Sequence, residues 1–354
     1  MDGRILDLSS ELRQIALIVI LLRAGLALKL EDLKKIGRPA LLMAFIPATF
    51  EIIGIVVLAS LLFSLSLIES LILGGILAAV SPAIIVPKMI KLIESGYGND
   101  KKIPHLILAG ASLDDVFVII LFTSFLHSMI QGDFNLELIY QLPLSIILGV
   151  GLGLLLGYLF VTFFNRFHMR DTIKVRLLFS VAFLLVVVEE QVKAIVLMSG
   201  LLGIMIMGGM IRHRYPVLAK SLVSKFEKIW VLAEIMLFVL VGAIVDISVI
   251  PSIGFNAILL IFGALMFRLL GVSVALIKTS FNIKEKLFIG FSYLPKATVQ
   301  AAIGAIPLSL GFQNGYLMLT VAVLAILITA PLGAISIDLL YTRLLTFEIQ
   351  EKGV

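Results

Sequence analysis

Long apolar runs follow one another along this chain, with short polar segments between them. A helix needs about 20 predominantly apolar residues to cross a bilayer. Eleven runs are long enough, at residues 10–29, 39–65, 68–93, 104–130, 138–165, 172–189, 192–211, 222–246, 252–278, 285–309 and 315–339. This pattern predicts an all-α polytopic membrane protein with about 11 transmembrane helices.

The composition agrees with a membrane protein and excludes an ordinary soluble domain. Of the 354 residues, 60% are apolar and 14% are charged, whereas a soluble domain averages about 45–50% and about 25%. The chain has no cysteine, so it forms no disulfide and no thiol-based metal site. The sequence shows no pairing of a nucleophile with a base, no metal-ligand set and no large loop. We therefore do not expect an enzyme.

Basic residues gather in alternate loops. They follow the first, third, fifth, seventh, ninth and eleventh apolar runs, while the intervening loops are short, neutral or acidic. The positive-inside rule places basic loops in the cytoplasm. The N-terminus is therefore predicted outside and the C-terminus in the cytoplasm. The formal net charge of +5 indicates membrane topology, and we expect no nucleic-acid partner.

Three features of the first half of the chain recur in the second half at nearly one spacing. The pairs are Glu51 with Arg268 (offset 217), Pro82 with Pro295 (offset 213) and Asp114 with Thr329 (offset 215). An odd number of crossings separates the two triplets of spans, so they face opposite ways. Such inverted repeats are typical of secondary transporters. Within the repeat, three helices precede the second triplet but only one precedes the first. We therefore expect that the chain lacks two N-terminal helices, through a truncated gene model, a fragment or real loss.

Prolines predict that one span in each triplet is interrupted. Span 68–93 contains Ser81-Pro82 and Pro87, and span 285–309 contains Leu294-Pro295-Lys296. Each proline removes an amide donor and frees a carbonyl in the preceding turn. Two crossed breaks would bring the ends of half-helices to the bilayer centre. Such a site suits a small desolvated cation beside a carboxylate.

Few charged side chains lie deep in the spans, and each costs roughly 2.5–3.5 kcal/mol at the bilayer centre unless it is paired. They are Glu51, Asp114, Asp115, Glu234, Arg268 and Lys296. Ser81, Asp114, Asp115, Lys296 and Thr329 all fall near the midplane and are predicted to converge. We interpret Glu51 and Arg268 as an ion pair that joins the two triplets. Glu234 either lines a cytoplasmic funnel or faces a partner helix.

Asp114 and Asp115 are predicted to have different roles, because adjacent side chains on a helix point about 100° apart. One carboxylate near Lys296 would be held ionised by the ammonium. Lys296 itself is either a strut or a proton carrier. Coupling then needs no cofactor beyond the transported ions, since a proton and a cation compete for one carboxylate.

Span 138–165 carries glycines at small-xxx-small spacing. Gly149, Gly151, Gly153 and Gly157 lie along it. Small residues at this spacing let helices approach closely in a membrane. We expect them to be a packing feature rather than a phosphate-binding loop.

Several stretches resemble the NHA branch of the sodium/proton antiporters, relatives of the NhaA and NapA types. They are LRQIALIVILLRAGLAL, AAVSPAIIVPKM, GYG, ASLDDV, YLPKATVQAAIG and LAILITAPLGA, and the resemblance extends from Leu8 to Gly333. It implies an NhaA/NapA-like inverted repeat with two interrupted crossing helices. It also implies that Asp115 is the aspartate that binds Na⁺, with Asp114 as its neighbour. Lys296 is similar to the core lysine, and Glu51 with Arg268 to the core acid and arginine pair.

The resemblance further implies a mobile core, residues 39–131 and 251–339, that moves against a dimerising scaffold, residues 10–29 and 172–246. Helix 138–165 would link them. A homodimer is expected if the two further N-terminal helices are present, because these belong to the dimer face in similar proteins.

The expected function is exchange of a monovalent cation, Na⁺ or Li⁺, for a proton by alternating access, with the bacterial cytoplasmic (inner) membrane as the location. The expected partners are the cation, the proton and the lipid bilayer. The alternatives are a sodium-coupled symporter of organic anions, an inactive transporter fragment, and a channel or non-transporting sensor.

Overall fold

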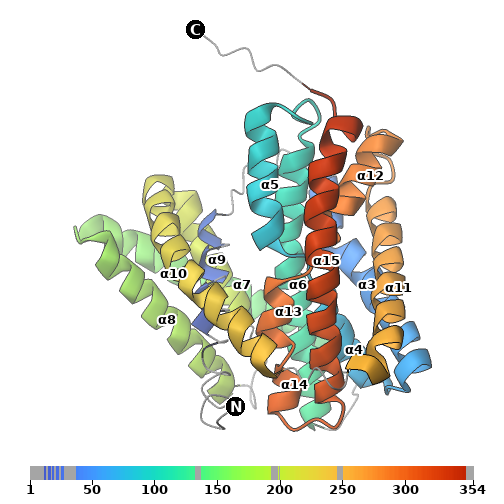
Figure 1. Cartoon of the computed structure of the whole chain (residues 1–354). Coiled ribbons are helices and arrows are strands. Elements are labelled where there is room, and N and C mark those ends of the chain that lie inside the picture. Colours follow the sequence, from blue (N-terminus) through green and yellow to red (C-terminus); the bar gives the residue numbers. More distant parts are fainter. Residues whose placement is uncertain are drawn as a thin grey trace. The chain divides into compact units, whose positions relative to one another are not determined.

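The computed structural model describes residues 37–131, 137–192, 200–244 and 250–347, together with Met198 and single positions between Leu12 and Ala27. Its helices are α3 (Arg38–Phe63), α4 (Leu67–Leu77), α5 (Pro82–Ser95), α6 (Ile103–Gln131), α7 (Glu137–Arg166), α8 (Asp171–Val192), α9 (Gly200–Arg214), α10 (Pro216–Ile244), α11 (Ile250–Ala275), α12 (Ile283–Ser292), α13 (Thr298–Ile303), α14 (Ile306–Ser309) and α15 (Gly315–Leu344) (Figure 1). Within these residues the only β contact is an isolated bridge between Tyr97 and Phe347. The predicted all-α fold is confirmed.

The described helices follow the predicted spans closely. Within the described part of the chain, six stretches are long and apolar enough to cross a membrane: Arg38–Phe63, Leu67–Ser95, Ile103–Ile130, Ile147–Arg166, Gly254–Ala275 and Gly315–Leu344. The predicted total of about 11 spans stays a prediction, and span 10–29 lies largely outside the described residues.

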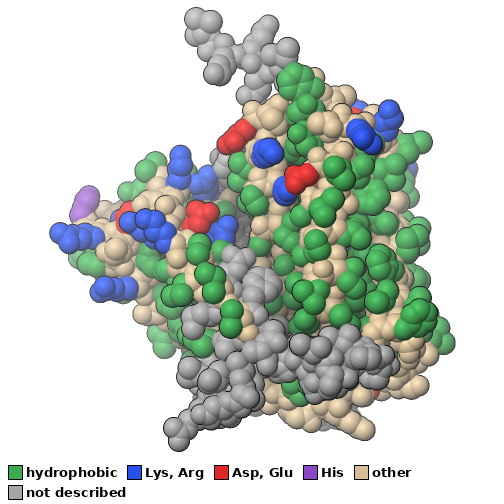
Figure 2. All heavy atoms as spheres, viewed as in Figure 1, with side chains coloured by type: hydrophobic (Ala, Val, Ile, Leu, Met, Phe, Trp, Pro, Cys, Tyr) green, Lys and Arg blue, Asp and Glu red, His purple; other side chains and the backbone are tan. Residues whose placement is uncertain are grey.

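The chain divides into two compact units. Unit 1 comprises Met1–Leu30 and Ile130–Ile244, and unit 2 comprises Glu31–Met129 and Val245–Val354. Both predicted triplets fall in unit 2, and α7, the predicted linker, falls in unit 1. Apolar side chains cover most of the length of unit 2 in Figure 2, and lysines, arginines and acids gather near the end where α5 and α15 finish.

In unit 1, glycines let α7 pack closely on α9. A Cβ atom added at Gly153 would lie 2.5 Å from the carbonyl oxygen of Gly203, and one at Gly157 would lie 2.6 Å from Met210 Cβ. Only glycine permits backbones to approach this closely. The packing role predicted for this glycine series therefore applies at these two positions.

In unit 2, α3 and α11 pack through reciprocal contacts of phenylalanine on glycine. A Cβ added at Gly54 would lie 2.6 Å from Phe267 Cδ2, and one at Gly271 would lie 3.0 Å from Phe50 Cβ. The two phenylalanines are 217 positions apart (267 minus 50), and so are the two glycines (271 minus 54). The two helices thus use equivalent positions of the repeat to contact each other.

The structure interrupts both helices that the fold prediction requires to be broken. The first helix stops after Leu77 and resumes as α5 at Pro82, and the second stops after Ser292 and resumes as α13 at Thr298. Pro82 occupies the first helical position, where its missing N–H costs little. Pro87, however, lies inside α5, which continues through it. The prediction of a break at Pro87 is wrong, because a packed membrane helix tolerates one lost backbone hydrogen bond.

Capping boxes begin both interrupted helices. Glu69 N–H donates to Ser66 Oγ while Glu69 Oε2 accepts from Ser66 N–H at 2.9 Å. Glu285 and Asn282 repeat the arrangement, with a 2.7 Å bond from Asn282 N–H to Glu285 Oε2. Each motif satisfies backbone donors that a helix start leaves unpaired. The boxes are 216 residues apart (282 minus 66), which extends the inverted repeat to local capping.

The two capping glutamates also tie the triplets together. Glu285 Oε1 and Oε2 each accept a 2.9 Å hydrogen bond from Lys101 Nζ, just before α6. Glu69 Oε1 accepts a 2.6 Å bond from Asn314 Nδ2, just before α15. We call each of these two contacts a clamp. One joins the start of α12 to the start of α6, and the other joins the start of α4 to the start of α15.

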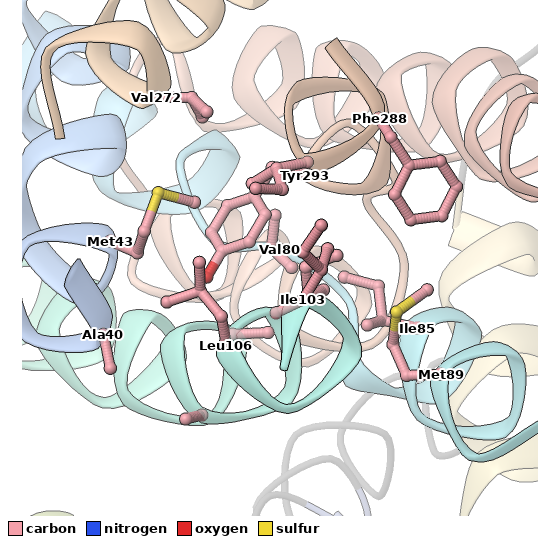
Figure 3. Close-up of a cluster of buried hydrophobic side chains, with 14 of the residues drawn as sticks. Ala40, Met43, Val80, Ile85, Met89, Ile103, Leu106, Val272, Phe288 and Tyr293 are labelled. Carbon is pink, nitrogen blue, oxygen red and sulfur yellow. The ribbon is translucent and has the colours of Figure 1, made fainter. Parts of the chain in front are cut away.

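An apolar cluster packs beside the helix interruptions. Figure 3 shows the ring of Tyr293 extending into it among Met43, Val80 and Leu106. These side chains are fully buried. The Tyr293 hydroxyl lies against Gly110, where an added Cβ would collide with it. The interruptions are therefore flanked by tightly packed hydrocarbon.

Candidate functional site

Five charged side chains lie buried where the two interrupted helices meet. Their exposed fractions are 1% for Glu51, 0% for Asp114, 5% for Asp115, 0% for Arg268 and 2% for Lys296. All five were predicted from sequence to lie near the midplane. Buried charges of this kind are stable only when paired and hydrogen-bonded.

Arg268 is the hub of this cluster. Its Nε donates to the carbonyl oxygen of Tyr293 at 2.7 Å. Its Nη1 donates to Glu51 Oε2 at 2.6 Å and to the carbonyl oxygen of Ala78. Its Nη2 lies 3.1 Å from each carboxylate oxygen of Asp114. The three guanidinium nitrogens thus contact two carboxylates and two backbone carbonyls, which a lysine could not reproduce.

Two of the groups that accept from Arg268 are backbone carbonyls at the C-terminal ends of half-helices. Ala78 and Tyr293 are the C-cap residues of α4 and α12, and they lie 215 positions apart (293 minus 78). A helix C-terminus carries partial negative charge and unpaired carbonyls. One guanidinium thus caps both half-helices, so the break in each triplet is stabilised by the same side chain.

Glu51 joins the two cationic side chains. Its Oε2 accepts from Arg268 at 2.6 Å and from Lys296 Nζ at 2.7 Å. Lys296 is thereby paired with Glu51, and within the described residues its ammonium donates to neither aspartate. Its backbone N–H donates to Thr329 Oγ1 at 2.9 Å, which holds the second interruption against α15.

The adjacent aspartates occupy different environments, as their angular separation requires. Asp114 contacts Arg268 and also accepts a 2.9 Å hydrogen bond from Val80 N–H. Asp115 Oδ1 has no hydrogen-bond partner among the residues that the structure describes. Asp114 is therefore held by a cation and a backbone amide, whereas Asp115 retains acceptor capacity.

The two interruptions contact each other directly. Ser81 N–H donates to the carbonyl oxygen of Pro295 at 2.8 Å. Ser81 Oγ is buried and has no partner within the described part of the chain. Pro295 in turn packs on Gly333 of α15, where an added Cβ would lie 2.7 Å from Pro295 Cδ. Only glycine at position 333 leaves room for this loop.

The structure adds two residues that the sequence reasoning did not single out. Gln300 of α13 donates from Nε2 to the carbonyl oxygens of Ala79 at 2.8 Å and Leu77 at 3.3 Å. Tyr293 places its ring 5.5 Å from the Arg268 guanidinium. A polar residue directly after a helix break was the available signal for Gln300. The side chain of Glu234 lies outside the described residues.

The fold and the site together define the class. An inverted repeat with two interrupted, crossing helices and a buried ionic cluster at their crossing is the architecture of secondary transporters. Over residues 4–343 the sequence matches the family described as "Sodium/hydrogen exchanger, transmembrane". The chain belongs to this family, which consists of integral membrane transporters and not of enzymes.

Relatives of known name support the assignment. The chain is 35% identical over 347 residues to sodium/hydrogen exchanger 9B2 of Mus musculus, covering 95% of this chain and 63% of that protein. It is 34% identical over 355 residues to sodium/hydrogen exchanger 9B1 of Homo sapiens, covering 96% and 67%. The chain thus spans roughly two thirds of the length of these relatives.

A solved structure shares the fold. The structure of the sodium proton antiporter MjNhaP1 from Methanocaldococcus jannaschii at pH 8 matches with a TM-score of 0.84 at 20% identity, covering 96% of this chain and 87% of that one. An electron-microscopy structure of the same antiporter matches with a TM-score of 0.74. The predicted antiporter-like fold is confirmed.

Proposed function

We propose that this chain exchanges a monovalent cation, Na⁺ or Li⁺, for a proton, and that the two compete for the carboxylate of Asp115. The observation that carries the proposal is a contrast among three buried acids. Glu51 and Asp114 each engage a basic side chain, whereas Asp115 Oδ1 lacks a donor in the described residues. A buried carboxylate with a vacant lone pair gains a partner by taking up either a proton or a cation.

The fixed charges around Asp115 support competition at one group. Arg268 and Lys296 are already engaged by Glu51 and Asp114. The cluster therefore has no spare cationic group for Asp115 in the contacts that the structure describes. Because only one carboxylate changes its occupant, a cation that binds displaces a proton, and exchange follows without a cofactor.

The proposed transport cycle is alternating access. In it the predicted core, residues 39–131 and 251–339, carries the cluster past the scaffold, residues 10–29 and 172–246, with helix 138–165 as the link. The whole buried cluster belongs to unit 2, which supports a core that moves as one body. A homodimer formed through the scaffold is part of the same proposal.

The proposed location is the cytoplasmic membrane of a bacterium, with the C-terminus in the cytoplasm. The alternation of basic and neutral loops supports this orientation. Protease protection of a C-terminal tag in inverted and right-side-out vesicles tests it.

The test of exchange uses purified protein in vesicles with a preset pH gradient and a fluorescent pH reporter. Added Na⁺ should collapse the gradient with the wild-type chain, and Asp115→Asn should abolish the response because it cannot take up a proton. Asp100→Asn, at an exposed position in the loop before α6, is the matched control and should respond like the wild type. A response that survives Asp115→Asn contradicts the proposed role of Asp115.

The second candidate, a sodium-coupled symporter of organic anions, requires cationic groups that are open to the anion. All three nitrogens of the buried Arg268 guanidinium already donate to protein acceptors, which disfavours this candidate. Na⁺ exchange that requires an added organic solute would favour it instead. A wild-type chain that is inert in both assays would support an inactive fragment, and conductance without saturation would support a channel.

A further inference from the structure

The side-chain amide of Gln300 is hydrogen-bonded through its nitrogen but, among the described residues, not through its oxygen. The residue is 0% exposed and lies on α13, just beyond the second helix interruption. Its Nε2 donates to the carbonyl oxygens of Ala79 and Leu77. Its Oε1 has no hydrogen-bond partner among the described residues.

The two carbonyl contacts determine which end of the amide points where. A flipped amide would place Oε1 against the carbonyl oxygens of Ala79 and Leu77, and both hydrogen bonds would become repulsive contacts. Rotation of the amide therefore cannot satisfy Oε1. A buried carbonyl oxygen without a donor is costly, so its natural partner is a species that carries positive charge or a proton to donate.

Among the described residues, two other buried side-chain oxygens without partners belong to this stretch of backbone or to the turn of α6 that contacts it through Asp114. They are Ser81 Oγ and Asp115 Oδ1. Ala79 is held by Gln300 and Val80 N–H by Asp114, the neighbour of Asp115. In an extended chain the Cα atoms of Ala79 and Ser81 are at most about 7 Å apart. The three oxygens are thus carried by elements that meet over three residues.

We propose that Gln300 Oε1 is a ligand of the transported cation, together with Asp115 Oδ1 and Ser81 Oγ. Carboxylate, hydroxyl and amide oxygens are hard ligands that can replace the water molecules around an alkali cation. The amide is neutral at every pH, so it contributes to cation affinity without taking up a proton. The inference rests on the proposed function and adds a residue that selects the cation.

The test compares Gln300→Met, which removes the amide at similar length, with Gln300→Asn, which keeps a shortened amide. Exchange is measured against Na⁺ and Li⁺ concentration, and cation binding is measured as the rise in melting temperature that Na⁺ produces in purified protein. Loss of one oxygen ligand should raise the half-saturating Na⁺ concentration about tenfold in Gln300→Met and less in Gln300→Asn. The maximal rate at saturating Na⁺ should stay close to that of the wild type.

Gln313→Met is the matched control, because Gln313 is exposed in the loop before α15. It should change neither readout. A purely structural role for Gln300 would lower the melting temperature without Na⁺ while leaving the half-saturating concentration and the Na⁺-induced rise unchanged. That result would overturn the inference and indicate that Oε1 holds a water molecule. If Gln300→Met does not fold, an unchanged half-saturating concentration in Gln300→Asn overturns it equally.

Failure of the proposed function gives a different result. A wild-type chain that shows no exchange, yet is stabilised by Na⁺ in a way that Gln300→Met loses, would contradict antiport and retain Gln300 as a cation ligand. A wild-type chain that exchanges normally, with unchanged Na⁺ dependence in both Gln300 variants, would retain antiport and overturn the ligand.

Discussion

Glu51 and Arg268 occupy equivalent positions of the two repeated triplets, 217 residues apart, and form a 2.6 Å ion pair with each other. The pair lies on α3 and α11, whose neighbouring glycines and phenylalanines also contact reciprocally. An inverted repeat that brings equivalent residues together places its symmetry axis between them. The charges on the axis must then be complementary, because two like charges buried there would repel.

Arg268→Lys is expected to destabilise the protein strongly. A lysine has three donors on one atom and cannot reach Glu51, Asp114 and the two half-helix ends together. Breaking a buried charge network of this kind costs about 3–5 kcal/mol. Thermal unfolding in detergent measures the loss. Arg343→Lys, at an exposed position near the end of α15, should unfold like the wild type, and an equal melting temperature for Arg268→Lys would contradict the hub role.

Glu51 and Lys296 should be energetically coupled. Glu51 Oε2 accepts from both Lys296 and Arg268, and Arg268 also contacts Asp114. Glu51→Gln therefore leaves one positive charge in excess, and Lys296→Gln relieves that excess. Residues in one ionic network show coupling free energies of about 0.5–3 kcal/mol. A double-mutant cycle of Glu51→Gln and Lys296→Gln measured by unfolding should therefore be non-additive. Additive losses in the free energy of unfolding would mean that the two side chains are not energetically coupled.

Gly333→Ala should disturb the crossing. The added methyl group would lie 2.7 Å from Pro295 Cδ, and Pro295 is held in place because its carbonyl accepts from Ser81 N–H. Overpacking costs about 1–3 kcal/mol, and exchange activity should fall with it. Gly151→Ala is the control, since a Cβ at Gly151 meets nothing within 4 Å, and alanine is favoured in a helix by roughly 1 kcal/mol. Equal stability and exchange activity of the two variants would show that the loop at Pro295 can shift to accommodate the methyl group.

The two clamps at the ends of unit 2 should differ in strength. Lys101→Met leaves the buried carboxylate of Glu285 without its ammonium, while Asn314→Leu removes a neutral donor from the more exposed Glu69. A fully buried carboxylate that loses its cation stays unpaired, whereas water can replace the lost donor at a partly exposed carboxylate. Unfolding should therefore show the larger loss for Lys101→Met. Lys102→Met, at an exposed position, should show none, and a reversed order would contradict this assignment.

Much of this protein follows from its sequence alone. Runs of about 20 apolar residues have few alternatives to membrane helices, because backbone polar groups must be satisfied inside the segment. The interruptions at Ser81-Pro82 and Leu294-Pro295 were predictable, since proline removes a donor and rare polar residues accompany it. The offset between Glu51 and Arg268 predicted their partnership without coordinates.

Tertiary structure decided which partner each buried group takes. The sequence reasoning placed Lys296 beside an aspartate, but the ammonium pairs with Glu51, and Arg268 takes Asp114. Pro87 resembles Pro82 in sequence, yet α5 continues through it. The role of Gln300 depends on two backbone carbonyls more than 220 residues away. Spans and breaks are local properties of the chain. Charge pairing and hydrogen bonding instead require atoms of distant segments to be placed to within a few tenths of an ångström, which only the folded arrangement sets.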